Sequence, residues 1–176
     1  AFDPRDPLAE SLGGSETAGV QRAAALVELK NTVTVFANVP TSGQWAGVNI
    51  VPAAGFNDTQ RGVPCDLTIV QRAPMAFGGR MASKVNMLWV HDLLFASRRQ
   101  DLQGSLHSID RIITVSDWQR RQYQSVLADL PDSLFLVARN GIDPKLIEDA
   151  RSWNIRRGQG LIMCAARPER GANARR

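Results

Sequence analysis

The chain has 176 residues, which is about the length of one globular domain. Its composition, 44% hydrophobic and 22% charged, is ordinary for a globular protein and excludes a disordered or fibrous chain. The sequence contains no apolar run of the roughly 18 residues that a membrane-spanning helix needs, so no transmembrane helix is expected.

The net charge of +4 is concentrated at one end of the chain. Residues 151–176 carry seven arginines against the single acid Glu169, so residues 1–150 have a net charge of −2. A nucleic-acid interface would need a basic face with interleaved aromatic side chains, which residues 1–150 do not offer. We therefore expect no nucleic-acid partner. Cys65 and Cys164 are too few for a disulfide scaffold or a zinc cluster, and a reducing, cytoplasmic setting is expected.

The first half of the chain predicts one helix followed by short strands. Apolar residues recur at helical spacing over residues 16–29, and Ser15 is the expected N-cap. Strands are predicted over three apolar or β-branched segments: 32–37, 48–51 and 66–70. Residues 40–47 predict a turn. Residues 72–84 are ambiguous, because Pro74 and two glycines break any periodicity.

The second half alternates strands with helices. Strands are predicted at 86–90, 111–115, 134–138 and 161–166. Residues 93–108 predict a helix that Gly104 interrupts. Ser116 and Gln119 predict a capping box at the start of a further helix, which ends before Pro131. The apolar face expected for that helix consists of Tyr123, Val126, Leu127 and Leu130.

This alternation predicts an α/β fold of the Rossmann-like, doubly wound type with a mainly parallel sheet. Such sheets bind ligands beyond the carboxyl ends of their strands. The unusual polar residues all follow apolar strands and are expected at that one edge: His91, Asp92, Ser116, Asn140, Gly141 and Arg167.

The domain organisation is expected to be incomplete. The glycines before the first helix should follow a strand, yet residues 2–12 contain two prolines and no apolar alternation, so the first, central strand is expected to be missing. We predict a Rossmann-like domain at 1–143, a linker at 144–160 and the truncated start of a second domain at 161–176.

Five short motifs occur in order along the chain. They are Gly-Gly-Ser-Glu-Thr at 13–17, Trp-Val-His-Asp at 89–92, Val-Ser-Asp-Trp-Gln at 115–119, Asn-Gly-Ile-Asp at 140–143 and Arg-Pro-Glu-Arg-Gly at 167–171. Together they resemble the GT-B glycosyltransferases of family 4, and Asp3-Pro4 resembles the Trp-Asp-Pro of one branch, with Phe2 in place of Trp. The resemblance spans residues 2–171 and implies the N-terminal, acceptor-side half of a GT-B fold without its donor-binding domain.

The resemblance implies a retaining enzyme that transfers a hexose from a nucleotide sugar to a saccharide or lipid-linked acceptor. It implies no cofactor and no divalent cation in the active site, and a lipid-linked acceptor would bring the enzyme to the inner face of a membrane. This chain alone, without its second domain, is expected to be inactive. Two alternatives stay open: an inert or acceptor-binding remnant, and a GT-B-type sugar-nucleotide epimerase.

His91 is the expected catalytic residue, because it follows a buried strand and its imidazole can donate or accept a hydrogen bond near neutral pH. The resemblance implies that it contacts the donor sugar or the acceptor hydroxyl. The competing interpretation is a structural histidine, with Asp92 as the N-cap of the next helix. His107 is expected to be a surface or packing residue.

Two pairs of residues are expected to bind the donor phosphates. Gly13 and Gly14 open a helix, where free N–H groups favour an anion, although a plain tight turn is the alternative. Arg167 and Arg170 would stabilise the leaving diphosphate, or else belong to a frayed end. The family has Lys at the position of Arg170, and Arg binds phosphate with a different geometry.

The remaining candidates are assigned to the acceptor or sugar cleft: Glu16, Asp92, Ser116, Trp118, Asn140 and Gly141. For Ser116 a helix cap is a sufficient explanation, and for Asn140 and Gly141 a turn is sufficient. Trp118 is expected in the core or in a cleft wall. The two histidines lack cysteine or acidic partners at ligand spacing, so no metal site is expected.

Overall fold

The computed structural model describes residues 13–57, 61–95 and 99–141. The chain divides into two units, residues 1–140 and 141–176. The described residues belong to the first unit, apart from Gly141. The predicted linker at 144–160, the strand at 161–166, Arg167 and Arg170 lie outside the described residues.

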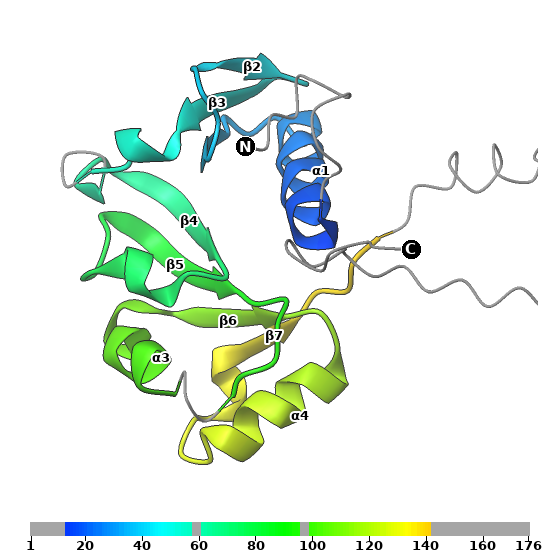
Figure 1. Ribbon diagram of the computed structural model, residues 1–176, viewed down its shortest axis with the longest axis vertical. Coiled ribbons are helices and arrows are strands. Elements are labelled where there is room, and N and C mark those ends of the chain that lie inside the picture. Colours follow the sequence, from blue (N-terminus) through cyan, green and yellow to red (C-terminus); the bar gives the residue numbers. More distant parts are fainter. Residues whose placement is uncertain (1–12, 58–60, 96–98, 142–176) are drawn as a thin grey trace, which may run out of the picture. The chain divides into compact units, whose positions relative to one another are not determined.

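The elements follow one another largely as the sequence predicts (Figure 1). The helices are α1 (Gly14–Glu28), α3 (Arg99–Ser105) and α4 (Asp117–Val126). The strands are β1 (Thr34–Ala37), β2 (Gly43–Trp45), β3 (Val48–Pro52), β4 (Cys65–Gln71), β5 (Ser83–Trp89), β6 (Arg111–Thr114) and β7 (Phe135–Val137).

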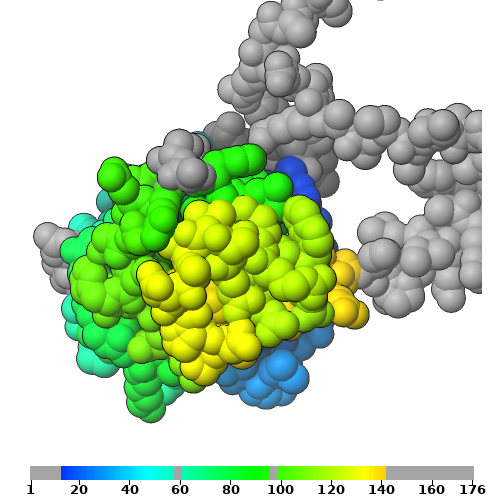
Figure 2. Space-filling view, turned by 90° about the horizontal axis from the view of Figure 1, so that it is seen from below, coloured from blue at the N-terminus to red at the C-terminus, as the bar shows by residue number. Residues whose placement is uncertain are grey.

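One sheet is entirely parallel, with the strand order β4-β5-β6-β7. Its central strands are apolar because both faces are covered, and Leu88 of β5 and Ile112 of β6 are fully buried. Helix α4 packs on β6 and β7, and Figure 2 shows α4 and the segment after it covering the molecule on that side. A parallel sheet flanked by helices confirms the α/β, Rossmann-like expectation.

The other sheet has the order β1-β3-β2, with β1 parallel and β2 antiparallel to β3. The predicted turn at 40–47 is therefore wrong in part, since it contains β2. A two-residue turn joins β2 to β3, with positive φ at Ala46 (47°) and Gly47 (77°), as in type I′ hairpins. Alanine rarely adopts this conformation, so the hairpin has little sequence signal. A Cβ at residue 47 would lie 2.7 Å from Val27, which also requires glycine.

Strands β1 and β4 are each an edge strand of one sheet, and the single sheet expected from the sequence is two sheets in the described part of the chain. Within the described ranges, β1 pairs only with β3 and β4 pairs only with β5. The start of β4 is exposed, and Leu67 keeps 41% of its surface accessible. Each of these strands thus has one open edge among the described residues.

Several helix boundaries differ from the prediction. Helix α1 begins at Gly14 with Gly13 as its N-cap, so Ser15 lies in the first turn. Within the helix predicted at 93–108, residues 93–95 are not helical, whereas α3 and a following 3-10 turn cover residues 99–108, and Gly104 lies inside α3 without ending it. In the ambiguous segment 72–84, a 3-10 helix (Pro74–Phe77) ends at Gly78 in the left-handed conformation.

Candidate functional site

The polar residues that follow the strands of the parallel sheet lie at its carboxyl edge. His91 and Asp92 come after β5, Ser116 after β6 and Asn140 after β7. Because these strands are parallel, their carboxyl ends lie at one edge, which confirms the shared edge expected for these residues. Gln71 and Arg72, at the end of β4, join the same edge, although the sequence did not single them out.

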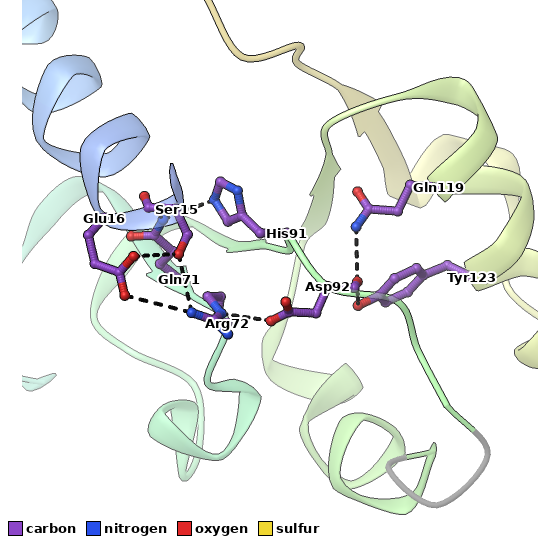
Figure 3. A network of polar contacts seen from close by, with 8 residues as sticks. All are labelled: Ser15, Glu16, Gln71, Arg72, His91, Asp92, Gln119 and Tyr123. Atoms are coloured by element: carbon purple, nitrogen blue, oxygen red, sulfur yellow. Dashed lines mark hydrogen bonds and ion pairs between the residues drawn. The ribbon is translucent and has the colours of Figure 1, made fainter. Parts of the chain in front are cut away.

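The start of helix α1 is joined to this edge by hydrogen bonds (Figure 3). Gln71 Nε2 donates to the Ser15 carbonyl oxygen over 2.6 Å, and Arg72 NH1 donates to Ser15 Oγ over 3.2 Å. The same Gln71 nitrogen lies 2.9 Å from His91 Nε2. The Gly13-Gly14 loop and the imidazole of His91 are therefore close together, although 77 residues separate Gly14 from His91 in the sequence.

A polar pocket of about 360 Å³ opens where these elements meet. Its lining consists of Ser15, Glu16, Gln71, Arg72, Ala73 and Asp92. Glu16 and Asp92 were expected in a cleft of this kind. The lining offers hydroxyl, carboxylate, amide and guanidinium groups, so a ligand with many hydroxyl groups would find both donors and acceptors.

Arg72 links the two carboxylates of the pocket. Its Nε lies 2.7 Å from Asp92 Oδ2, and its NH1 lies 3.8 Å from Glu16 Oε1. The backbone of Arg72 has a positive φ of 65°, which is uncommon for a residue with a side chain and recurs at functional sites. The sequence signal for Arg72 was its place just after a strand, as for His91, but the irregular segment that follows obscured it.

The environment of His91 favours its neutral form. Burial is the main cause that lowers the pKa of the His91 imidazole, and the nearby positive charge of Arg72 lowers it further. The negative charges of Asp92 and Glu16 raise it. The ring also contacts Trp89 in a tilted arrangement, with 4.5 Å between the ring centroids and 45° between the ring planes, and the Arg22 guanidinium lies over the same indole. Asp92 is not a helix N-cap, because the residues that follow it, 93–95, are not helical.

The N-terminus of α1 already faces a carboxylate. Ser15 Oγ donates to Glu16 Oε2 over 2.8 Å, and this carboxylate occupies the space that a Cβ on Gly13 would need. A negative charge is favourable at this end of a helix. The expected phosphate site at Gly13 and Gly14 stays a prediction, and a phosphate bound there would compete with Glu16 for the same helix end.

Helix α4 holds the segment that follows β5. Gln119 Nε2 and the Tyr123 hydroxyl both donate to the Asp92 carbonyl oxygen, over 2.9 and 3.2 Å. Gln122 makes two hydrogen bonds with the backbone of Leu94. Burial raises the pKa of the Tyr123 hydroxyl to about 12, and the charge of Asp92 acts in the same direction. These contacts orient Asp92 and explain why residues 93–95 are not helical.

The predicted capping box at Ser116 is confirmed in its first half. Ser116 Oγ accepts a hydrogen bond from the backbone N–H of Gln119. The Gln119 side chain, however, accepts from the N–H of Val115 rather than Ser116. Gln119 is only 2% exposed, so it serves as a buried link between the ends of β5 and β6.

The other candidates lie outside the lining of the pocket. Trp118 is 59% exposed, so its interpretation as a core residue is wrong. Asn140 and Gly141 are exposed and follow β7. His107 is exposed just before β6, at the opposite edge of the sheet from His91, as a surface residue should be.

The described ranges contain no group of three His, Cys, Asp or Glu side chains arranged to hold a metal ion. No helix among these residues combines the length and apolar character needed to cross a bilayer. Comparison of the chain with protein-family models, curated proteins and solved structures finds no match.

Proposed function

We propose that this chain is the acceptor-side domain of a retaining GT-B glycosyltransferase, similar to family 4, which transfers a hexose from a nucleotide sugar to a saccharide or lipid-linked acceptor. The polar pocket at the carboxyl edge of the parallel sheet is the observation that supports it most. Two carboxylates and one guanidinium around an open space of about 360 Å³ suit the hydroxyl groups of a sugar.

The roles of the residues follow from their chemistry. His91, beside the pocket, hydrogen-bonds the sugar that reacts, and Glu16 and Asp92 bind hydroxyl groups of the acceptor. Gly13 and Gly14 face the donor phosphates, and Arg167 and Arg170 stabilise the leaving diphosphate. The acceptor oxygen bonds to the anomeric carbon on the side from which the nucleoside diphosphate departs, and the hydroxyl proton passes to the departing phosphate oxygen, so the configuration is retained. The nucleotide sugar is a substrate, and no cofactor takes part.

Replacement of His91 with alanine tests the proposal in the complete gene product, supplied with UDP- and GDP-linked hexoses and saccharide acceptors. We expect kcat/KM for transfer to fall about tenfold to a hundredfold, the loss of one hydrogen bond to a charged or reacting group. Product formation is measured by mass spectrometry, and the anomer by NMR.

His107→Ala is the matched control, because it removes the exposed histidine at the opposite edge of the sheet, and its activity should equal that of the unchanged protein. Full activity in His91→Ala would remove His91 from the mechanism. Recovery of an epimerised nucleotide sugar, or saccharide binding without any transfer, would overturn the transferase proposal in favour of an epimerase or a binding module.

We also propose that a further parallel strand, from outside the described residues, pairs between β1 and β4 as the central strand of a doubly wound sheet. The open edges of both strands and the 41% exposure of Leu67 support it. Alternate amides of β4 that point away from β5 should then be protected from hydrogen exchange in the complete gene product. Exchange at the rate of exposed loop amides would contradict the proposal.

A further inference from the structure

We propose that Gln71 is a positioning residue for His91: its amide holds the imidazole neutral, with the proton on Nδ1, so that His91 acts as a hydrogen-bond donor and not as a base. The assignment of a sugar as the acceptor of that hydrogen bond rests on the proposed function. The state of the imidazole itself follows from the contacts among Ser15, Gln71 and His91.

The orientation of the Gln71 amide follows from its contact with the backbone of α1. Its terminal atom lies 2.6 Å from the Ser15 carbonyl oxygen, which can only accept a hydrogen bond. An amide oxygen in that position would set two acceptors against each other. The atom is therefore the amide nitrogen, and Ser15 fixes an orientation that other contacts leave open.

The same nitrogen determines the state of His91. It lies 2.9 Å from His91 Nε2 and carries a second hydrogen, so Nε2 must accept. A neutral histidine whose Nε2 accepts has its proton on Nδ1. In the imidazolium form, Nε2–H would face N–H at this distance, so Gln71 disfavours protonation of the ring.

The charged groups around His91 come from three segments of the chain. Helix α1 contributes Glu16 and Arg22, the end of β4 contributes Arg72, and Asp92 is the next residue in the chain. The two cations lower the pKa of the imidazole and the two carboxylates raise it, so the charges act in both directions. Burial lowers the pKa of the His91 imidazole, which agrees with the neutral form that the Gln71 contact requires.

Gly19 allows this contact. A Cβ at residue 19 would lie 2.7 Å from Gln71 Oε1, too close for the amide to keep its place. The atom that would be hit is the end of a flexible side chain, so Gly19→Ala displaces the amide while α1 itself gains helix propensity. This substitution disturbs the orientation of Gln71 without removing a group that touches His91.

The test is nitrogen NMR of the full chain labelled with ¹⁵N-histidine, with His107→Ala used to assign the two histidines. At neutral pH, His91 should show the signals of a protonated Nδ1 and an unprotonated Nε2. In Gln71→Glu, the carboxylate should stabilise the imidazolium and raise the pKa of His91 by about one unit or more, a tenfold change in its protonation equilibrium.

A second variant keeps the test independent of the new charge in Gln71→Glu. Gly19→Ala should weaken the preference for the Nδ1–H form, while Gly104→Ala, a matched change in α3 where an added Cβ meets nothing within 4 Å, should leave His91 unaltered. An Nε2-protonated ring in the unchanged protein would overturn the proposal, as would identical His91 spectra in all the variants. If the NMR result is as expected but no sugar is transferred, the proposed function fails and the positioning role of Gln71 stands.

Discussion

Replacing Phe77 with alanine is expected to lower the free energy of unfolding by about 3–5 kcal/mol, the loss typical of a fully buried phenylalanine. Phe77 has no accessible surface and belongs to the core cluster that includes Leu88, Leu102 and Ile112. It sits in the 3-10 helix between β4 and β5, which packs against α3. A cavity there would lose contacts to β5 and to α3 together.

Urea unfolding followed by circular dichroism measures this loss. Met75→Ala is the matched control, since Met75 lies in the same 3-10 helix but is 63% exposed, and its effect should stay within about 0.5 kcal/mol. Equal effects of the two substitutions would contradict the packing described for this core.

Gln119→Leu is expected to cost about 1–3 kcal/mol of stability, because it leaves two partly buried backbone groups without this partner. Its side chain accepts from the Val115 N–H and donates to the Asp92 carbonyl oxygen. The Tyr123 hydroxyl also donates to that carbonyl, which moderates the loss at Asp92. The same change should loosen Asp92, and with it the ion pair to Arg72 in the pocket.

Gln124→Leu serves as the comparison on the same helix. Gln124 bonds Asp132 at an exposed position, so its loss should cost less than about 1 kcal/mol. Thermal unfolding of both variants measures the two losses of stability. A loss for Gln119→Leu no larger than that for Gln124→Leu would show that the buried link does not hold the ends of β5 and β6 together.

Local sequence patterns predicted the elements whose signals lie within a few residues. The apolar runs of β5 and β6 were correctly predicted as strands, because both faces of these strands are covered and their residues are therefore apolar. Ser116 was recognisable as an N-cap from its own residue type and from the apolar face of α4. Two misassigned positions make hydrogen bonds with distant residues, which no local pattern contains. Ser15 accepts from Arg72 and does not cap α1, and the Leu94 N–H donates to Gln122.

The β2–β3 hairpin shows a second reason why the sequence-based prediction was wrong in places. Its turn has Ala46 where such turns usually have Asn, Asp or Gly, so local propensity did not predict a hairpin here. The apolar contacts of β3 with α1, through Val48, Ile50 and Ala23, stabilise the sheet to which β2 adds an edge. Tertiary packing here overrides a weak local signal.

The sequence by itself determined the α/β class, the positions of most strands along the chain, and that His91, Asp92, Ser116 and Asn140 follow strands of one parallel sheet. It could do so because strand and cap signals are local and parallel strands share one carboxyl edge. Only the tertiary structure decided that Gln71 and Arg72 complete the pocket, since their partners Ser15 and His91 lie 56 and 20 residues from Gln71. Contacts over such separations depend on how α1 packs beside β4 and β5, and no pattern in the sequence specifies the orientation of an amide between a backbone carbonyl and an imidazole.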